Sequence, residues 1–525
     1  MLRRCRRHFR RALAALPTGS AGGRCAALAL PALLAAAAVA SVPASAQTLQ
    51  EALAYAYSNN PTLLAARAQL RAVDENVPQA LAGWRPTVVL SGAAGYAEAT
   101  ARQPAVTPVA RDRFGNVVDP GGVPFSNYTD VNRNTLNLNA TITQPIYRGG
   151  RTVASTRRAE NQVLAQRARL LATEQQVLLD AVAAYVSVIR FQEELRLNIN
   201  NEQVLMRQLQ ATNERFRVGE ITRTDVAQAE SRLAGARAAR AQAEGQLQSA
   251  RAVFLRVIGL APQRLVPPQP LTPPVRSQAE AAQLAAVNNP NVVAALFDEA
   301  AARALVDVQF AALLPQVSVQ GQVFRIDNNL QRGTRQTGSQ VTANVSVPLY
   351  QGGAEHAAVR QARQQVQQAR QVVDDQRRTA TQQATSAWET LVSARAQVVA
   401  NRAQIRAQEI ALDGVQREAI VGSRTTLDVL NAEQELLNAR VALVRALAEL
   451  VNASHSLAAA VGRHTAQDLG LPVQIYDMEA YYRAVRNRWF GTGDYSGAAE
   501  SQPAPSAQQV SASAAAPQTA ERRRR

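Results

Sequence analysis

The sequence predicts a mainly helical chain that also contributes β-strands to a membrane barrel. Three observations lead to this fold class: an export signal, a duplicated unit of strands and long helices, and the lack of any apolar run of 18 residues after residue 46. A spanning helix needs about 20 apolar residues, so the mature chain is expected to cross a membrane with strands. Because open strand edges leave backbone groups unpaired in lipid, such strands belong to a closed barrel.

Residues 1–46 predict a cleaved signal peptide. They carry seven arginines and no acidic residue, an apolar stretch at 26–40, and the ending Ala-Ser-Ala at 44–46. This order of a basic, an apolar and a small-residue segment is typical of exported proteins. Pro31 interrupts the apolar stretch, which is too short for a membrane anchor. Both cysteines lie in this segment, so we expect neither a disulfide nor an acylated cysteine in the mature chain.

The net charge of +17 comes from arginine, because the chain contains no lysine. Part of the charge lies in residues 1–46 and part in the terminal run 522–525, and the rest is spread along predicted helices. This distribution is typical of a solvated helix surface, so we expect no nucleic-acid partner. Hydrophobic residues, with alanine the commonest, make up 47% of the chain and aromatic residues 5%, which favours close-packed helices.

The chain contains an internal duplication. Asn-Asn-Pro at 59–61 returns at 288–290, and Pro-x-Tyr-x-Gly-Gly at 145–150 returns at 348–353. A third motif, Val-Gly followed by Thr and Asp-Val, occurs in both halves in the same order. Such self-similarity indicates two copies of one structural unit. The predicted repeats span 47–276 and 277–490.

Each repeat is predicted to contribute two strands. Apolar and polar residues alternate in these segments, which gives a strand one apolar and one polar face. On an exported chain without another hydrophobic anchor, strands of about ten residues with this pattern favour a membrane barrel with a wet interior. Prolines and glycines from Glu98 to Asn134 predict a long loop within the first repeat. The predicted strands span about 84–97, 135–147, 315–326 and 340–350.

Each repeat then continues into a long helical hairpin. Proline is absent from 146–261 and from 349–471. Gly219 and Gly422 lie within these spans and are predicted to form the hairpin tips, because glycine tolerates the left-handed backbone that ends a helix. Leucine and valine repeat every seven residues along 429–451, as in a coiled-coil seam. The predicted hairpins span 150–260 and 353–462.

Shorter helices are predicted before each strand pair, at about 49–81 and 279–313. Asn60-Pro61 and Asn289-Pro290 fit an N-cap followed by proline at the first helical position.

With these duplicated motifs the chain resembles the TolC-like outer-membrane efflux proteins, from the first Asn-Asn-Pro to about Trp489. The resemblance implies a homotrimer in the outer membrane of a Gram-negative bacterium, extending into the periplasm. Four strands from each chain would close one twelve-stranded barrel, and the coiled-coil hairpins would form an α-helical barrel. The residues alone require only that several chains combine, because single-chain barrels start at about eight strands.

The resemblance also implies a function. The protein would be the exit duct of a tripartite efflux or type I secretion system, a passive channel with a periplasmic gate. Its partners would be outer-membrane lipid, a periplasmic adaptor (membrane fusion) protein and an inner-membrane pump. The sequence does not separate drug efflux from protein secretion.

Gate and docking residues follow from the same resemblance. Arg424 matches the family's gate arginine, Asp225 its acidic partner, and Asp428 an acidic ring at the periplasmic opening. A guanidinium and a carboxylate form a strong paired hydrogen bond, which suits a latch, although a solvated Arg424 is the alternative. Asn431 and Ala419 depart from the family pattern, which has an acid and an aromatic residue there, so a weaker constriction is expected. The tip residues expected to contact the adaptor are Val218, Gly219, Thr222, Val421, Gly422 and Thr425.

Motifs of enzymes are missing from the sequence. The predicted mature chain has three histidines without ligand spacing, and no phosphate loop or nucleophile elbow. We therefore expect no catalytic activity, cofactor or metal. An alternative function is a trimeric coiled-coil surface adhesin or scaffold, but such a stalk keeps its strands at one end, whereas here strands occur in both halves.

The C-terminal part of the sequence divides into two segments. Aromatic residues and arginines at 481–490 predict either a collar on the helical body or a partner contact. The small and polar residues at 491–525 predict a disordered tail.

Overall fold

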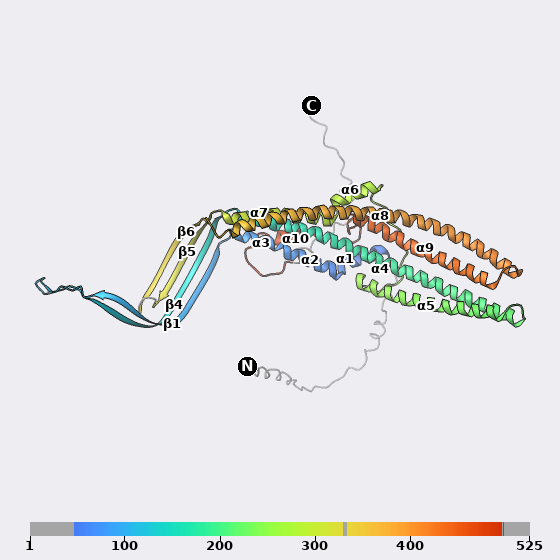
Figure 1. Cartoon of the computed structure of the whole chain (residues 1–525), viewed down its shortest axis with the longest axis horizontal. Helices are drawn as coiled ribbons and strands as arrows, with labels where there is room; N and C mark the ends of the chain where they lie inside the picture. Colours follow the sequence, from blue (N-terminus) through green and yellow to red (C-terminus); the bar gives the residue numbers. More distant parts are fainter. Residues whose placement is uncertain (1–46, 329–332, 496, 498–525) are drawn as a thin grey trace, which may run out of the picture. The chain divides into compact units, whose positions relative to one another are not determined.

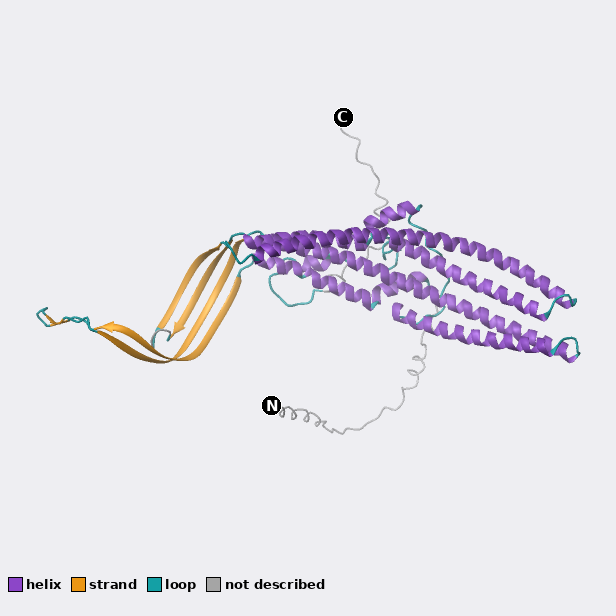
Figure 2. Cartoon of the chain, in the orientation of Figure 1, coloured by secondary structure: helices purple, strands orange, loops and turns teal. Residues whose placement is uncertain are grey.

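A computed structural model describes residues 47–328, 333–495 and 497. The predicted signal peptide and most of the predicted tail lie outside these residues. From Gln47 onward the chain forms one compact unit of helices and strands (Figures 1 and 2). Within the described part, no helix combines the length and apolar character needed to span a membrane.

The first repeat runs from short helices through strands into a long helical hairpin. A proline at the first position starts α2, where the Asn60 side chain accepts a hydrogen bond from the Thr62 amide at 2.9 Å. The elements are α1 (Leu49–Asn59), α2 (Pro61–Asp74), α3 (Asn76–Leu81), a 3-10 turn η1 (Ala82–Trp84), β1 (Thr87–Val106), β2 (Ala110–Arg111), β3 (Val117–Asp119), β4 (Pro124–Arg148), α4 (Arg151–Arg217) and α5 (Arg223–Ile258).

The second repeat has the same order of short helices, 3-10 turn, two long strands and helical hairpin, without described counterparts of α3, β2 and β3. Asn289 caps α7 as Asn60 caps α2, with 2.9 Å between its side-chain oxygen and the Asn291 amide nitrogen. The elements are α6 (Gln278–Asn288), α7 (Pro290–Phe310), a 3-10 turn η2 (Ala311–Leu313), β5 (Gln316–Asp327), β6 (Arg335–Ser346), α8 (Ala354–Ile420), α9 (Thr426–Ala460) and the additional α10 (Ala480–Val485). The prediction of two long helical hairpins joined to four strands is confirmed.

The four long strands form one antiparallel sheet in the order β1-β4-β5-β6. The cross-strand register places the apolar positions of neighbouring strands next to one another, and likewise the polar positions. On one face, Val88, Ile142, Gly321 and Val341 lie side by side. On the other face the neighbouring row is Thr87, Thr143, Gln320 and Thr342. The sheet therefore has an apolar and a polar face, and its edges are β1 and β6.

Two predictions about the strands are wrong. The predicted loop from Glu98 to Asn134 is largely a two-stranded ribbon, because β1 and β4 stay paired up to Val106 and Pro124. Pro104 is tolerated there because β1 is an edge strand, where a missing N–H costs least. The last strand ends at Ser346 and does not reach residue 350. Pro348 follows shortly after and lacks the N–H that would continue the ladder.

The helical core lies where the short helices meet the bases of the hairpins. Tyr185 of α4 is fully buried against Phe254 of α5, with ring centroids 6.3 Å apart. The Tyr185 hydroxyl lies 2.7 Å from the Gln47 carbonyl oxygen, which fixes the start of the described chain to α4. Figure 1 shows α5 running alongside α4 and α9 alongside α8, as two antiparallel hairpins.

The segment after α9 packs on this helical body. Tyr482 of α10 contacts a cluster formed by Val77, Ala159 and Val163. Of the two alternatives that the sequence left open for residues 481–490, the structure places the start of the segment on the helices. Trp489 and Phe490 remain exposed.

Candidate functional site

The free ends of the two hairpins form the same turn. At the first tip, α4 ends at Arg217, and Gly219 has a left-handed φ of +80°. The Glu220 amide donates back to the Arg215 carbonyl at 3.0 Å. At the second tip Gly422 has a φ of +81°, and the Ser423 amide donates to the Glu418 carbonyl at 3.0 Å. Glycine is needed at these positions because a side chain would strain the left-handed backbone.

A capping box starts the return helix of each hairpin. The Thr222 hydroxyl donates to the Asp225 carboxylate at 2.8 Å, and the Thr222 amide donates to it at 3.0 Å. Thr425 makes the same bonds to Asp428 at 2.9 and 3.0 Å. Both predicted gate acids are therefore part of a helix-capping box. The sequence contained the signal, because Thr-x-x-Asp before a helix is a variant of the capping-box pattern.

The predicted gate arginine has a partner in its own hairpin. The Arg424 Nε donates to Glu418 Oε2 at 2.9 Å across the turn, and this hydrogen bond raises the pKa of Arg424. In the described part of the chain, no bond joins Arg424 to Asp225. Hydrogen bonds from Thr425 lower the pKa of Asp428, and the nearby charge of Arg424 lowers it further.

The first tip has an ion pair of reversed polarity. Arg215 pairs with Glu220 across the turn, and that hydrogen bond lowers the pKa of Glu220. In the first hairpin the arginine precedes the glycine and the acid follows it, whereas in the second hairpin Glu418 precedes and Arg424 follows. Each turn is thus closed by a charge pair, and sequence reasoning found only one of the four residues.

One predicted departure from the family pattern has a structural role. Asn431 of α9 accepts a hydrogen bond from Arg232 of α5 at 2.8 Å, so it joins the two hairpins within one chain. Ala419 lies in the last turn of α8 beside Ile420. No sequence motif indicates the Arg232–Asn431 bond, because it depends on how the hairpins pack.

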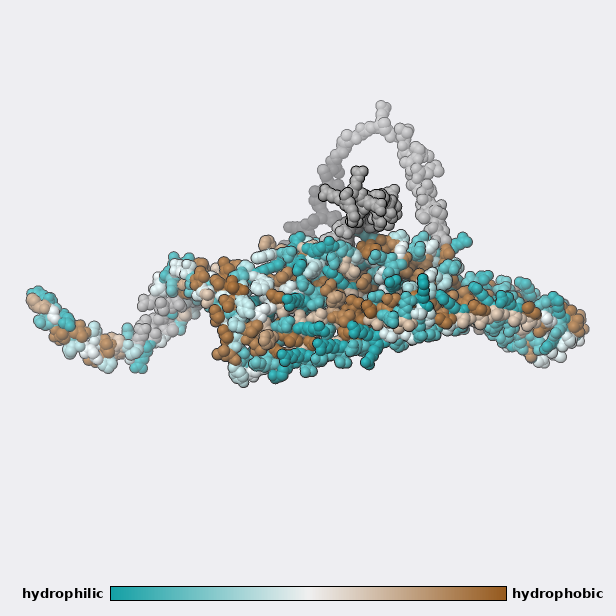
Figure 3. All heavy atoms as spheres, turned by 90° about the horizontal axis from the view of Figure 1, so that it is seen from above, coloured by the Kyte–Doolittle hydropathy of each residue, from teal (hydrophilic) through white to brown (hydrophobic). Residues whose placement is uncertain are grey.

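Apolar side chains are exposed at both tips. Val218 and Val421 are each 78% exposed and Ile420 is 81% exposed. In Figure 3, hydrophobic residues lie among hydrophilic ones at this end of the hairpins. Valines that are so exposed bury little of their surface within the chain, and therefore suit contact with another molecule.

A polar groove lies between the two hairpins above the tips. Residues of α4, α5, α8 and α9 line it, among them Gln397 and Asn401. Glu194 of α4 is buried here and accepts a hydrogen bond from Arg445 Nε of α9 at 2.9 Å. This bond raises the pKa of Arg445. A buried charge needs such a partner, so the pair fixes how the hairpins lie against each other.

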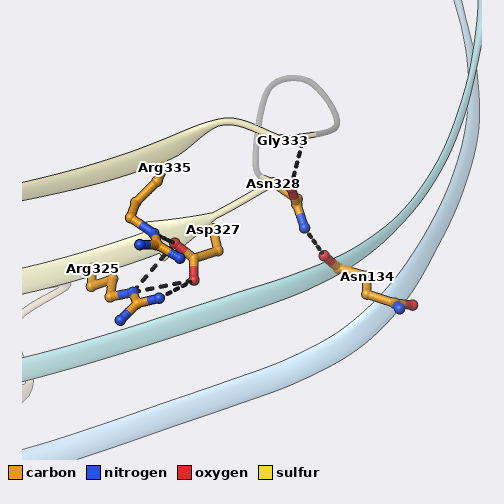
Figure 4. A network of polar contacts seen from close by, with 6 residues as sticks. All are labelled: Asn134, Arg325, Asp327, Asn328, Gly333 and Arg335. Atoms are coloured by element: carbon orange, nitrogen blue, oxygen red, sulfur yellow. Dashed lines mark hydrogen bonds and ion pairs between the residues drawn. The ribbon is translucent and has the colours of Figure 1, made fainter.

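The far end of the sheet carries a second polar network. Arg325 and Arg335 both point at Asp327, at 2.9 and 3.0 Å (Figure 4). Asn328, with a positive φ of 57°, accepts from the Gly333 amide and donates to the Asn134 carbonyl, both at 2.7 Å. These contacts join Asn328, at the end of β5, to β4 and to Gly333, which precedes β6.

Two histidines form a buried pair near the end of α9. His455 Nδ1 lies 2.9 Å from His464 Nε2. Within the described residues, no group of three His, Cys, Asp or Glu side chains is arranged to hold a metal ion.

Comparisons with known proteins give a consistent set of relatives. The family described as Outer membrane efflux protein matches residues 49–260 and 281–463. Outer membrane efflux protein BepC of Brucella suis is 35% identical over 447 residues, covering 85% of this chain and 92% of that protein. Outer membrane protein TolC of Vibrio cholerae is 23% identical, covering 81% of this chain and 92% of that protein. The CmeC outer membrane channel of Campylobacter jejuni has a TM-score of 0.67 at 16% identity, over 84% of this chain and 89% of that one.

Proposed function

Because the chain belongs to the outer membrane efflux protein family, we propose that it is the exit duct of a tripartite efflux or type I secretion system. It is an outer-membrane channel protein of the TolC type, and its helices extend into the periplasm. One observation carries the proposal: the sheet has one apolar face, one polar face and two open edges.

Closure of the sheet requires further copies of the chain. Four strands cannot close a pore, and an open edge in lipid leaves backbone groups without partners. Three chains would pair β1 of one with β6 of the next and close twelve strands. The apolar row with Val88 and Val341 would then face lipid, and the row with Thr87 and Thr342 would line a wet lumen. In this proposal the duct conducts passively and catalyses no reaction.

The tips would form the periplasmic gate and the docking site. When the hairpins of neighbouring chains meet, Arg424 lies where it can exchange its Glu418 partner for Asp225 of an adjacent hairpin. Asp428 of each chain would add negative charge around the opening and favour cations. The exposed Val218 and Val421 would bury their side chains against the adaptor that connects the duct to an inner-membrane pump.

The gate is tested by conductance. Arg424→Ala in purified channels in planar bilayers is expected to raise single-channel conductance, because the charge pairs that hold the tips together are lost. Arg417→Ala is the matched control, since Arg417 pairs with Asp413 within α8 at 2.8 Å and does not cross the turn. Wild-type conductance in Arg424→Ala would remove Arg424 from the gate, while any conducting pore at all supports the duct.

A further inference from the structure

The segment that follows α10 is held at the helix-proximal end of the sheet. Arg85, two residues before β1, donates from Nη1 to the Arg488 carbonyl at 2.5 Å. The Arg85 guanidinium also lies over the Trp489 ring, 5.2 Å from its centroid. The adjacent Trp84 carbonyl accepts a hydrogen bond from Gln144 of β4 at 2.9 Å. Trp489 is therefore fixed at the level where β1 begins and β4 ends.

Helix α10 anchors this segment on the side of the helical body. Val485 is buried, and the Tyr481 hydroxyl donates to Glu75 at 2.9 Å. Arg486 pairs with Glu160 of α4 at 3.0 Å. The segment is thus held at two points: α10 packs on the helical body, and Arg85 contacts Arg488 and Trp489 next to β1.

Despite this fixation, the aromatic side chains that the segment presents are exposed. Trp489 is 63% exposed and Phe490 is 90% exposed. Other apolar residues at the same end of the sheet are also exposed: Trp84 at 41%, Leu349 at 91% and Tyr350 at 80%. Large apolar side chains that are held in place yet uncovered mark a contact surface.

We propose that Trp489 and Phe490 are an interfacial anchor that inserts into the headgroup region of the periplasmic leaflet of the outer membrane. The position follows from continuity with the apolar face of the strands, which begins at Val88, three residues after Arg85. Tryptophan is favoured at membrane interfaces because one part of its ring is apolar and its N–H is polar. The flanking Arg85 and Arg488 suit the phosphate of a phospholipid headgroup. A membrane anchor is thus contributed by the segment after the last helix and not only by the strands.

The inference rests on the outer-membrane location and not on the gate. The chain has three tryptophans, Trp84, Trp388 and Trp489, which makes fluorescence a direct test. A variant that carries Trp84→Phe and Trp388→Phe leaves Trp489 as the only tryptophan, which is excited selectively over tyrosine at the red edge of its absorption. The full-length mature protein is reconstituted in phosphatidylcholine–phosphatidylglycerol vesicles with or without bromine on the acyl chains near the headgroup. We expect brominated lipid to quench Trp489 emission and iodide to quench it little.

Two controls make the result decisive. The first is a chain with Trp388 as its only tryptophan. Because Trp388 packs against the core of the helical body, its emission is expected to be equal in both lipids. Leu90→Trp, in a chain without the natural tryptophans, reports insertion of β1, because Leu90 is 79% exposed beside the apolar row. If brominated lipid does not quench the emission of Leu90→Trp, both the membrane channel and the anchor are refuted.

If brominated lipid quenches the emission of Leu90→Trp, the membrane channel stands. Two outcomes at Trp489 would then refute the anchor alone. If iodide and not lipid quenches Trp489, the segment faces the periplasm. If neither quenches it, a neighbouring subunit covers it.

Discussion

The buried histidine pair predicts how the stability of the helical body depends on pH. His455 and His464 are 3% and 0% exposed, and burial lowers the pKa of His455 to about 4 and that of His464 to about 3. The ordinary value is 6.5. Between these values the unfolded chain binds protons that the folded chain does not bind, so stability falls as the pH falls from about 6.5 toward 4.

The magnitude follows from proton linkage. Near pH 5, each histidine that stays neutral in the folded chain lowers the free energy of unfolding by about 2 kcal/mol relative to neutral pH. The pair together therefore lowers it by about 4 kcal/mol. The loss affects the base of the hairpins, because His464 lies two residues before Ala466, whose amide donates to buried Glu174 of α4 at 2.8 Å. Acid should therefore weaken the contact between the end of α9 and α4.

The assay compares unfolding free energies of the detergent-solubilised protein near pH 7.5 and near pH 5, followed by far-UV circular dichroism in urea. Between the two pH values, the unfolding free energy of the variant His455→Gln/His464→Gln should fall by about 4 kcal/mol less than that of the wild type. Because each protein is compared with itself, a general destabilisation of the variant does not affect the result. His356→Gln, at an exposed position on α8, should behave as the wild type. Equal losses in the double variant and the wild type would refute the assignment of this pH dependence to the pair.

Two further substitutions test local features. Thr425→Ala removes the N-cap of α9 and should cost about 1 kcal/mol, so amides in the first turn of α9 should exchange about fivefold faster, whereas Thr426→Ala should leave exchange unchanged. Burial raises the pKa of Asp74 to about 7, above its ordinary 3.8, so its ionisation lowers stability as the pH rises from about 4 to 7. Asp74→Asn should abolish that fall and stabilise the protein at neutral pH; an unchanged pH profile in urea unfolding would contradict this.

The sequence predicted the parts of the fold that depend on local signals. Two long proline-free spans gave the helical hairpins, the glycines gave their turns, and Asn-Pro gave the starts of α2 and α7. Alternation gave the two faces of the sheet. All of these follow from periodicity and backbone preference, which a single chain reveals without its tertiary contacts.

Features that depend on pairing partners were not predictable in the same way. The ribbon of β1 and β4 lies in a segment with proline, and only the register of the two strands shows that it pairs. Glu418 became the partner of Arg424 because the left-handed turn brings them together, and the Arg232–Asn431 bond depends on hairpin packing. The capping boxes are the exception, since Thr-x-x-Asp was visible in the sequence.

We expect several copies of this chain to close one pore that none closes alone. Native mass spectrometry of the mature protein released from lipid nanodiscs tests it directly, because the mass of the particle counts the chains that share the barrel. Three chains per particle is the predicted result. A single chain, stable in lipid with its β1 and β6 edges unpaired, would contradict the account.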